Sequence, residues 1–198
     1  MHNFILTLLF LIIMPVAKSN TLIIGDSIFA LTKDVPNNIR SAGYEFDMRA
    51  QAGAKIEQIA KQYSQYKSVH GVPSIVIMDG GGNNILRGKL LECIRKNDKC
   101  FLEVERIANF SNDFRDQLIN DGVKKIILVG IHYFHGWKAR LNTIVDYAMD
   151  RVICDDYCIL VDIREPFKEK GLLMMDGIHP NAKGSKIISD LILLALQE

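Results

Sequence analysis

Residues 21–27 read TLIIGDS, and this stretch decides the fold class that the sequence predicts. Thr21–Ile24 is a short, continuous apolar run that ends at Gly25 and Asp26, which is typical of a strand buried on both faces. Further strand-like runs follow at Tyr44–Arg49, Pro73–Met78, Lys125–Val129 and Cys158–Ile163. The sequence thus predicts five strands.

Helical patterns lie between these strands. Apolar side chains repeat at helical spacing in residues 56–63, 104–119, 141–149 and 187–195. Alternation of helices with continuous apolar strands indicates a parallel sheet that is covered on both faces. The prediction is an α/β fold, a three-layer α/β/α sandwich of the flavodoxin-like type with a five-stranded parallel sheet. Ligands bind such folds at the carboxyl ends of the strands, near the point where the strand order reverses.

The composition is that of an ordinary globular domain. Of 198 residues, 48% are hydrophobic and 24% are charged, which excludes a disordered tail or a fibrous rod. Lys and Arg number 24 against 23 Asp and Glu, so the basic excess of a phosphate-neutralising nucleic-acid binder is missing. No repeat or Pro/Ser/Gly-rich linker interrupts the chain, and one domain over residues 20–198 is expected.

The first residues have the features of an export signal. Phe4–Val16 is almost entirely apolar, and as a helix it would span roughly 20 Å, short of the ~30 Å core of a bilayer. Ala17 and Ser19 put small residues where a signal peptidase needs them. We therefore expect residues 1–19 to be a signal peptide and the protein to be periplasmic or secreted. An uncleaved anchor is the alternative, because no Lys or Arg precedes Phe4.

Four cysteines form two local pairs along the chain. Their even number suits an oxidising compartment, and we favour disulfides within the pairs because each flanks a polar, turn-like stretch. Four buried free thiols are the alternative, which a cytosolic protein would favour. A zinc site is not expected, since neither spacing is C-x-x-C and no His is near in sequence. The pairs are Cys93 with Cys100 and Cys154 with Cys158.

Chemically useful residues follow the first three strands. Ser27 stands directly after the first strand, where a hydroxyl can become a nucleophile if a general base is near, although Ser and Asp are also common helix caps. Gly53 follows the second strand and can present a backbone N–H to the same crevice. The third strand is followed by GGGNN at 80–84, in which the Asn83 amide could stabilise an oxyanion. No P-loop Lys-Ser/Thr and no dinucleotide fingerprint accompany these glycines.

A histidine and an acid follow the fifth strand, in DGIHP at 176–180. The carboxylate of Asp176 could hold the His179 ring through Nδ1–H and leave Nε2 free to take a proton from a serine. A plain surface loop with a helix cap at Asn181 is the alternative, but it does not account for the Asp–His pairing.

Together these residues resemble the blocks of the SGNH hydrolases, also called the GDSL esterase/lipase family. The matching stretches are GDS at 25–27, Gly53, GGNN at 81–84 and DGIHP at 176–180, and the resemblance runs from Leu22 to the C-terminus. The third block usually ends in Asp where this chain has Asn84, a departure that bears on loop stability rather than on catalysis.

The resemblance implies a serine esterase, thioesterase or lysophospholipase that needs no metal and no cofactor. Ser27 would be the nucleophile, His179 the base and Asp176 the residue that orients it. The N–H groups of Ser27 and Gly53 and the side chain of Asn83 would form the oxyanion hole. Because His179 must be neutral to act as a base, activity should rise through neutral pH.

The substrate is less well defined by the sequence. The stretch after the fourth strand is the most aromatic in the chain, and Tyr133, Phe134 and Trp137 could line a pocket for an acyl chain or a sugar. An ester of a small molecule, lipid or glycan is therefore the expected partner, with a carbohydrate O-acetylesterase as the alternative enzyme. A non-catalytic binding module on the same fold is the non-enzyme alternative. His132 and His135 have no carboxylate partner nearby, which favours structural or pocket-lining roles over a metal site.

Overall fold

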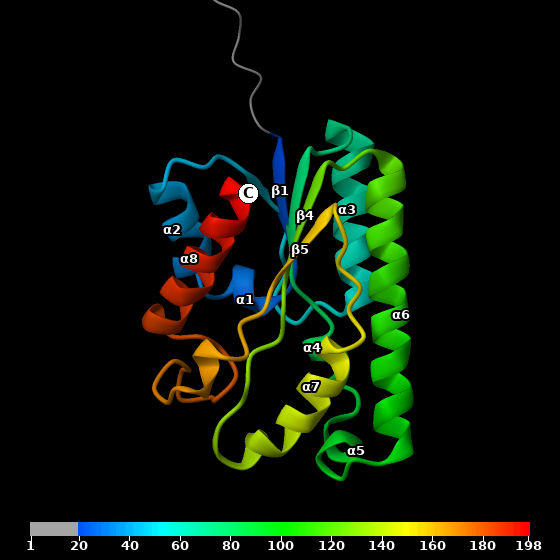
Figure 1. Cartoon of the computed structure of the whole chain (residues 1–198), viewed down its shortest axis with the longest axis vertical. Coiled ribbons are helices and arrows are strands. Elements are labelled where there is room, and N and C mark those ends of the chain that lie inside the picture. Colours follow the sequence, from blue (N-terminus) through cyan, green and yellow to red (C-terminus); the bar gives the residue numbers. More distant parts are fainter. Residues whose placement is uncertain (1–19) are drawn as a thin grey trace, which may run out of the picture.

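The computed structural model describes residues 20–198, so the predicted signal peptide lies outside the described residues. A parallel sheet of five strands runs through its centre in the order β2-β1-β3-β4-β5 (Figure 1). This is the flavodoxin-like order, and it reverses between β1 and β3. The predicted fold class is confirmed. The strands are β1 (Thr21–Ile24), β2 (Asp47–Met48), β3 (Ile75–Met78), β4 (Lys125–Val129) and β5 (Cys158–Val161).

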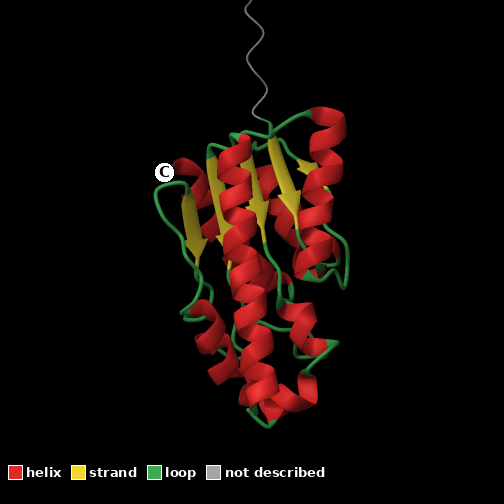
Figure 2. Ribbon diagram, turned by 90° about the vertical axis from the view of Figure 1, so that its right-hand side faces the viewer, coloured by secondary structure: helices red, strands yellow, loops and turns green. Residues whose placement is uncertain are grey.

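Helices cover both faces of the sheet (Figures 1 and 2). The helices α3 (Ile56–His70) and α6 (Asp98–Asp121) pack on one face, over an apolar core that includes Ile59, Tyr63 and Phe114. The other face is covered by α2 (Asp34–Ser41) and α8 (Ala182–Gln197). Successive residues along a strand point alternately into these two cores, which explains why the strands are apolar on both faces.

A third, smaller core lies beyond the carboxyl ends of the strands. The elements that build it are α4 (Gly82–Leu86), α5 (Leu90–Ile94), the 3₁₀ helix η1 (Gly136–Leu141) and α7 (Asn142–Met149), together with the first half of α6. In Figure 1, α4, α5 and α7 lie below the sheet, beside the long helix α6. Disulfides join Cys93 to Cys100 and Cys154 to Cys158, so the predicted local pairing is confirmed.

The strands and helices differ from the predicted ranges mainly at their ends. The sequence predicts the second strand over Tyr44–Arg49, but β2 is only Asp47–Met48, because it is an exposed edge strand with polar residues around it. Beyond these two residues, the N–H of Arg49 donates a hydrogen bond of 2.8 Å to the carbonyl oxygen of Ile23. The fifth strand ends at Val161 rather than at Ile163. A short 3₁₀ helix, η2 (Pro166–Lys168), and the four-residue helix α1 (Ser27–Ala30) complete the described chain.

Candidate active site

Ser27 is the first residue of α1, shortly after the chain leaves the sheet at the end of β1. The carboxylate of Asp26 caps this helix by accepting a hydrogen bond of 3.0 Å from the backbone N–H of Ile28. The Ser27 hydroxyl is therefore not needed as a cap. It lies 3.5 Å from Asp26 Oδ1, and the residue is 8% exposed. Within this motif, Asp26 is the residue that caps the helix, and the Ser27 hydroxyl has no capping role.

The backbone just before Ser27 is fixed by a buried glutamine. The side chain of Gln62 accepts a hydrogen bond of 2.8 Å from the N–H of Gly25 and donates one of 2.9 Å to the carbonyl oxygen of the same residue. Gly25 has φ +151°, and a Cβ atom there would lie 1.9 Å from Oδ1 of Asp79. Only glycine fits this close approach, which gives the first residue of the GDS motif a physical reason.

Asp79 comes directly after β3 and is buried next to Asp26. Its Oδ1 accepts a hydrogen bond of 2.7 Å from the N–H of Asp26, and its Oδ2 has no hydrogen-bond partner among the described residues. Burial, and next the negative charge of Asp26, raise the pKa of Asp79 well above its ordinary value. A neutral carboxyl group at this position avoids two adjacent buried charges.

Asn83 lies in the first turn of α4, the helix that follows β3, and its side chain extends to Asp26. Its Nδ2 donates a hydrogen bond of 2.8 Å to Oδ2 of Asp26, and the residue is 8% exposed. An amide nitrogen carries two hydrogens, so this bond fixes the side chain and leaves one N–H. Asp26 thus connects the helix that carries Ser27 with the helix that carries Asn83.

Asn84 stands where the family's third block usually has Asp. Its Oδ1 accepts a hydrogen bond of 3.0 Å from the backbone N–H of Ile56, at the first residue of α3. Its Nδ2 donates to Glu57 at 3.3 Å. The amide therefore ties the third block to the start of α3, so the departure from Asp leaves the loop anchored.

Asp176 and His179 form a pair on an exposed turn after β5. Oδ2 of Asp176 lies 2.5 Å from Nδ1 of His179, while Oδ1 accepts backbone hydrogen bonds from Ile178 at 2.9 Å and His179 at 3.0 Å. Burial alone would raise the pKa of Asp176, but the hydrogen bonds from the His179 side chain and from the two backbone groups lower it to about 2. Asp176 is thus ionised at neutral pH and orients the imidazole ring.

His132, after β4, connects this turn to the rest of the protein. Its ring is 4% exposed and stacks on Phe167, with Nδ1 2.9 Å from the carbonyl oxygen of Tyr133 and Nε2 2.7 Å from that of Ile178. Burial lowers the pKa of His132, which favours the neutral ring. A neutral imidazole donates through one nitrogen only, so one of the two carbonyls receives a hydrogen bond.

Ser27 and His179 line one cleft, with a volume of about 220 Å³. Asp26, Asn83 and Arg87 contribute to its walls. Within residues 20–198, the Ser27 hydroxyl makes its hydrogen bond with Asp26 and not with His179.

Gly53 lies beside this cleft and not in the set of residues that line it. It has φ +78°, and its carbonyl oxygen accepts a hydrogen bond of 3.4 Å from Nη1 of Arg87. A Cβ atom at Gly53 would lie 2.1 Å from the same nitrogen. The Arg87 side chain thus lies against the predicted oxyanion-hole glycine.

The three aromatic residues predicted for the substrate pocket have different environments. Phe134 is buried and lines the cleft. The Tyr133 hydroxyl donates a hydrogen bond of 2.5 Å to Asp146. Trp137 is 59% exposed, with the Lys138 ammonium group 4.8 Å from the centre of its ring. Of the three, Phe134 is the one that the structure brings together with Ser27 and His179.

Three residues near the site, Gln62, Asp79 and Arg87, are not identified by the sequence analysis, which does expect a structural or pocket-lining role for His132. Gln62 could have been found, because it is a polar residue on the otherwise apolar face of α3. Asp79 also carries a signal, since an acid ends an apolar strand there. Arg87 has no distinguishing pattern around it.

Comparison with known proteins identifies the family of this chain. A family model described as GDSL-like lipase/acylhydrolase matches residues 17–192, and the chain belongs to this family. Its members act on ester bonds, and the protein is accordingly an ester hydrolase. No curated protein sequence matches the chain significantly.

Solved structures share the fold at low sequence identity. A lipase, Lip_vut3, from a goat rumen metagenome has a TM-score of 0.71 at 14% identity, covering 89% of this chain and 96% of its own. The hydrolase LAE5 from the metagenome of Lake Arreo, Spain, has a TM-score of 0.62 at 21% identity, with coverages of 90% and 95%. An acetylxylan esterase, Axe2, from Geobacillus stearothermophilus has a TM-score of 0.66 at 16% identity, with coverages of 91% and 94%.

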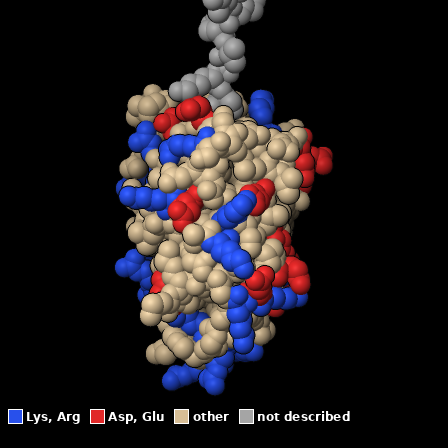
Figure 3. Space-filling model, turned by 90° about the vertical axis from the view of Figure 1, so that its left-hand side faces the viewer, with Lys and Arg blue, Asp and Glu red and all other residues tan. Residues whose placement is uncertain are grey.

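One face of the molecule carries a mixture of charges. On the face over α2 and α8, basic and acidic side chains are interspersed (Figure 3). In the described part of the chain, no three His, Cys, Asp or Glu side chains are grouped as a metal site requires. No helix among residues 20–198 is both long and apolar enough to cross a membrane.

Proposed function

We propose that the protein hydrolyses carboxylic esters or thioesters through an acyl-enzyme on Ser27. The observation that carries this proposal is the cleft shared by Ser27 and His179, with the His179 ring held by an ionised Asp176. A weak hydroxyl nucleophile needs a base, and the base needs a third group that fixes its tautomer. Asp176 binds Nδ1, so Nε2 is the nitrogen that faces the substrate side.

In the first step, Ser27 Oγ attacks the carbonyl carbon while His179 Nε2 takes the hydroxyl proton. The ionised Asp176 stabilises the imidazolium that forms. His179 then gives this proton to the leaving alcohol or thiol, and the acyl group remains on Ser27. In the second step, His179 activates a water molecule that releases the acid and restores the serine.

The negative charge of the tetrahedral intermediate needs hydrogen-bond donors. Ser27 is the first residue of α1, and the first N–H groups of a helix have no partner within it. The backbone N–H of Ser27 is therefore one proposed donor. The others are the second N–H of Asn83 Nδ2 and the backbone N–H of Gly53. Replacing Asn83 with Ala is expected to lower kcat by ~10²–10³-fold.

A carbohydrate O-acetylesterase is the second candidate, because Axe2 with a similar fold is an acetylxylan esterase. The two candidates differ in acyl chain length: a deacetylase hydrolyses acetyl esters best, whereas an acyl esterase or lysophospholipase prefers longer chains.

The test is hydrolysis of a p-nitrophenyl ester series, from acetyl to palmitoyl, by the protein from residue 20 onward and by its Ser27→Ala variant. We expect turnover by the first and none by the second, with unchanged thermal unfolding. Covalent labelling by a serine-directed phosphonate, blocked by a short-chain ester, provides a second readout. Absence of turnover with every ester would overturn the proposed substrate class, and turnover retained by Ser27→Ala would exclude Ser27 as the nucleophile.

We also propose that residues 1–19 direct export and are removed. The two disulfides support this proposal, because disulfides persist in oxidising compartments. The mass and N-terminal sequence of the protein recovered from the periplasm or culture medium would test it. We expect an N-terminus near Asn20, and an intact Met1 in a membrane fraction would indicate an uncleaved anchor.

A further inference from the structure

The turn Asp176–His179 is bound to more distant parts of the protein by few hydrogen bonds. Among the described residues, two side chains from outside the turn reach it. Lys138 donates a hydrogen bond of 2.6 Å to the carbonyl oxygen of Asp176, and Nε2 of His132 lies 2.7 Å from the carbonyl oxygen of Ile178. The contact of Lys138 is exposed, whereas His132 is 4% exposed. His132 is therefore the buried attachment of this turn.

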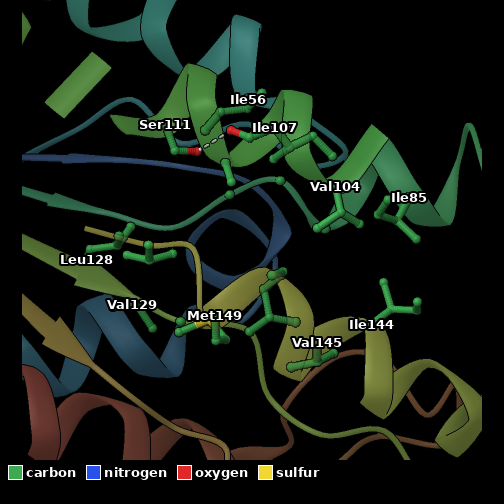
Figure 4. Close-up of a pocket in the computed structure, with 18 of the residues that line it drawn as sticks. Ile56, Ile85, Val104, Ile107, Ser111, Leu128, Val129, Ile144, Val145 and Met149 are labelled. Atoms are coloured by element: carbon green, nitrogen blue, oxygen red, sulfur yellow. Dashed lines mark hydrogen bonds between the residues drawn. The ribbon is translucent and has the colours of Figure 1, made fainter. Parts of the chain in front are cut away.

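The His132 ring is fixed by the aromatic side chains around it. It stacks on Phe167, with the ring centroids 5.0 Å apart and the planes 22° from parallel, and it meets Phe134 edge-on at the same centroid distance. Both phenylalanines are buried, and Phe134 also lines the apolar cavity between α6 and α7 (Figure 4). Because a ring packed in this way cannot turn aside without disturbing the core, it transmits the position of the sheet to the turn.

Both ring nitrogens of His132 face carbonyl oxygens. Nε2 lies 2.7 Å from that of Ile178, and Nδ1 lies 2.9 Å from that of Tyr133, the next residue in the chain. A carbonyl oxygen only accepts hydrogen bonds, so a ring nitrogen without a hydrogen would set two lone pairs against each other. This repulsion is greater in the shorter contact. In a neutral ring, the hydrogen therefore belongs on Nε2, between the ring and Ile178.

The surroundings of the ring favour its neutral form. Burial lowers the pKa of His132, and the hydrogen bonds with the two carbonyl groups oppose this effect without cancelling it. Two ionisable side chains act on the ring through their charges: His179 lowers its pKa, and Asp26 raises it. The other side chains packed against the ring, Phe134 and Phe167, do not titrate.

The carbonyl group of Ile178 belongs to the same peptide group as the N–H of His179. This N–H donates a hydrogen bond of 3.0 Å to Oδ1 of Asp176, and the carbonyl oxygen faces His132. Since a peptide group is planar, bonds at both its oxygen and its hydrogen fix the plane from which the Cα atom of His179 extends. Proton transfer from Ser27 depends on that placement, because an error of about 1 Å can cost roughly 10²-fold in rate.

We propose that His132 is a positioning residue, which donates its Nε2–H to the carbonyl group of Ile178 and thereby holds His179 within reach of Ser27. Because this role concerns the base of the reaction, it rests on the proposed function. His132 lines the cleft, but carbonyl groups of the chain occupy both of its ring nitrogens. The ring thus acts through Ile178 and not on the substrate.

Two substitutions separate the hydrogen bond from the ring. The amide nitrogen of glutamine is as many bonds from Cα as Nε2 of histidine, whereas that of asparagine matches Nδ1. Both variants lose the contacts with Phe134 and Phe167, so the difference between them reports on the bond to Ile178. We expect His132→Asn to lower kcat by roughly 10²-fold with little change in KM, and His132→Gln to recover most of this loss. Equal losses in the two variants would overturn the positioning role.

A matched control is available on α3. His70 is an exposed histidine at the end of this helix and does not line the cleft. His70→Asn should therefore keep the kcat and KM of the unmodified protein. Thermal unfolding of all three variants shows how much stability the loss of the ring costs, and a loss of stability common to His132→Asn and His132→Gln leaves the comparison of their kcat values intact.

Two further measurements do not depend on ester hydrolysis. NMR of the imidazole nitrogens in the unmodified protein shows whether Nε2 of His132 carries a hydrogen at neutral pH, and a bare Nε2 would overturn the proposal. Hydrogen–deuterium exchange in the turn Asp176–His179 should be faster in His132→Asn than in His132→Gln. Equal exchange, or a turn that exchanges faster without a loss of kcat, would overturn it as well. If no ester is hydrolysed, the proposed function fails, and the NMR and exchange results still decide whether His132 holds the turn.

Discussion

The two halves of the candidate active site are held in place by different means. Ser27 and Asn83 are both 8% exposed and stand at the ends of buried strands, where Asp26, Asp79 and Gln62 fix the backbone. Asp176 and His179 lie on a turn outside the sheet, and their side chains are 44% and 20% exposed.

The difference shows what each half requires. In the proposed mechanism, Ser27 and the Asn83 amide need an accurate position relative to each other, and the hydrogen bond between Asp26 and Asn83 links them across 57 residues of sequence. As the proposed base, His179 needs an orientation, which three hydrogen bonds to Asp176 provide within four residues. His132 is the buried contact between the turn and the sheet, through the carbonyl group of Ile178.

The largest expected effect tests whether the two halves act as one unit. Ser27→Ala and His179→Ala should each lower kcat for a p-nitrophenyl ester by at least about 10⁴-fold, and the double variant should lose no more than either single one. Steady-state kinetics of the three proteins provides the measurement. Losses that multiply in the double variant would show that the two residues act independently.

Asp176→Asn tests only the exposed half of the candidate active site, the turn that carries Asp176 and His179. The amide cannot stabilise an imidazolium as the carboxylate does, and we expect kcat to fall by roughly 10²–10⁴-fold with little change in KM. Glu169→Gln, a nearby exposed acid that pairs with Lys183, is the control and should retain activity. Equal rates for Asp176→Asn and the unmodified protein would refute the orienting role.

Gln62→Leu tests the buried half through stability. The substitution leaves the N–H group of Gly25 without its partner, at a cost of roughly 1–3 kcal/mol. The Gly25 carbonyl oxygen loses the bond from Gln62 but keeps one of 3.0 Å from the backbone N–H of Gln51. Gln65→Leu, on the exposed face of the same helix, should change the free energy of unfolding by less than about 0.5 kcal/mol. Urea unfolding of both variants measures the difference, and similar values for the two would mean that Gln62 does not hold the motif.

The smallest expected effect concerns the pH dependence of stability. Since folding raises the pKa of Asp79 above 3.8, the folded protein keeps a proton that the unfolded chain loses, and stability falls as pH rises from about 3.8 through the folded pKa. Asp79→Asn keeps an oxygen for the Asp26 N–H but removes this titration. Its free energy of unfolding should therefore decline less steeply over that range, and parallel curves for the two proteins would contradict the raised pKa.

Much of the fold could be predicted from the sequence, because the strands that matter are continuous apolar runs. Thr21–Ile24 and Lys125–Val129 have the predicted bounds. The edge strand β2 was predicted too long, since its pairing depends on β1 alone and its polar residues carry no periodic signal. The short helices α4 and α5 were not predicted, because they contain only five residues each and are stabilised by packing against α6.

Some residues of the candidate site could also be predicted from the sequence, and others could not. Ser27, Asn83, Asp176 and His179 could be predicted because they belong to local motifs at strand ends. The roles of Asp79 and Gln62 depend on contacts with Asp26 and Gly25 that are distant in sequence. The apolar cavity between α6 and α7 could not be predicted, since the residues that line it, among them Val104, Ala108 and Val145, are indistinguishable from ordinary core residues until the helices are packed.

The most direct test of the account is to look for the acyl-enzyme itself. The protein and its Ser27→Ala variant would be mixed with p-nitrophenyl hexanoate, quenched in acid within milliseconds and analysed by intact-protein and peptide mass spectrometry. We predict a hexanoyl adduct on the peptide that contains Ser27, present in the first protein and missing from the variant. Turnover without an adduct at any quench time, or an adduct on another residue, would contradict the claim that Ser27 carries the acyl group.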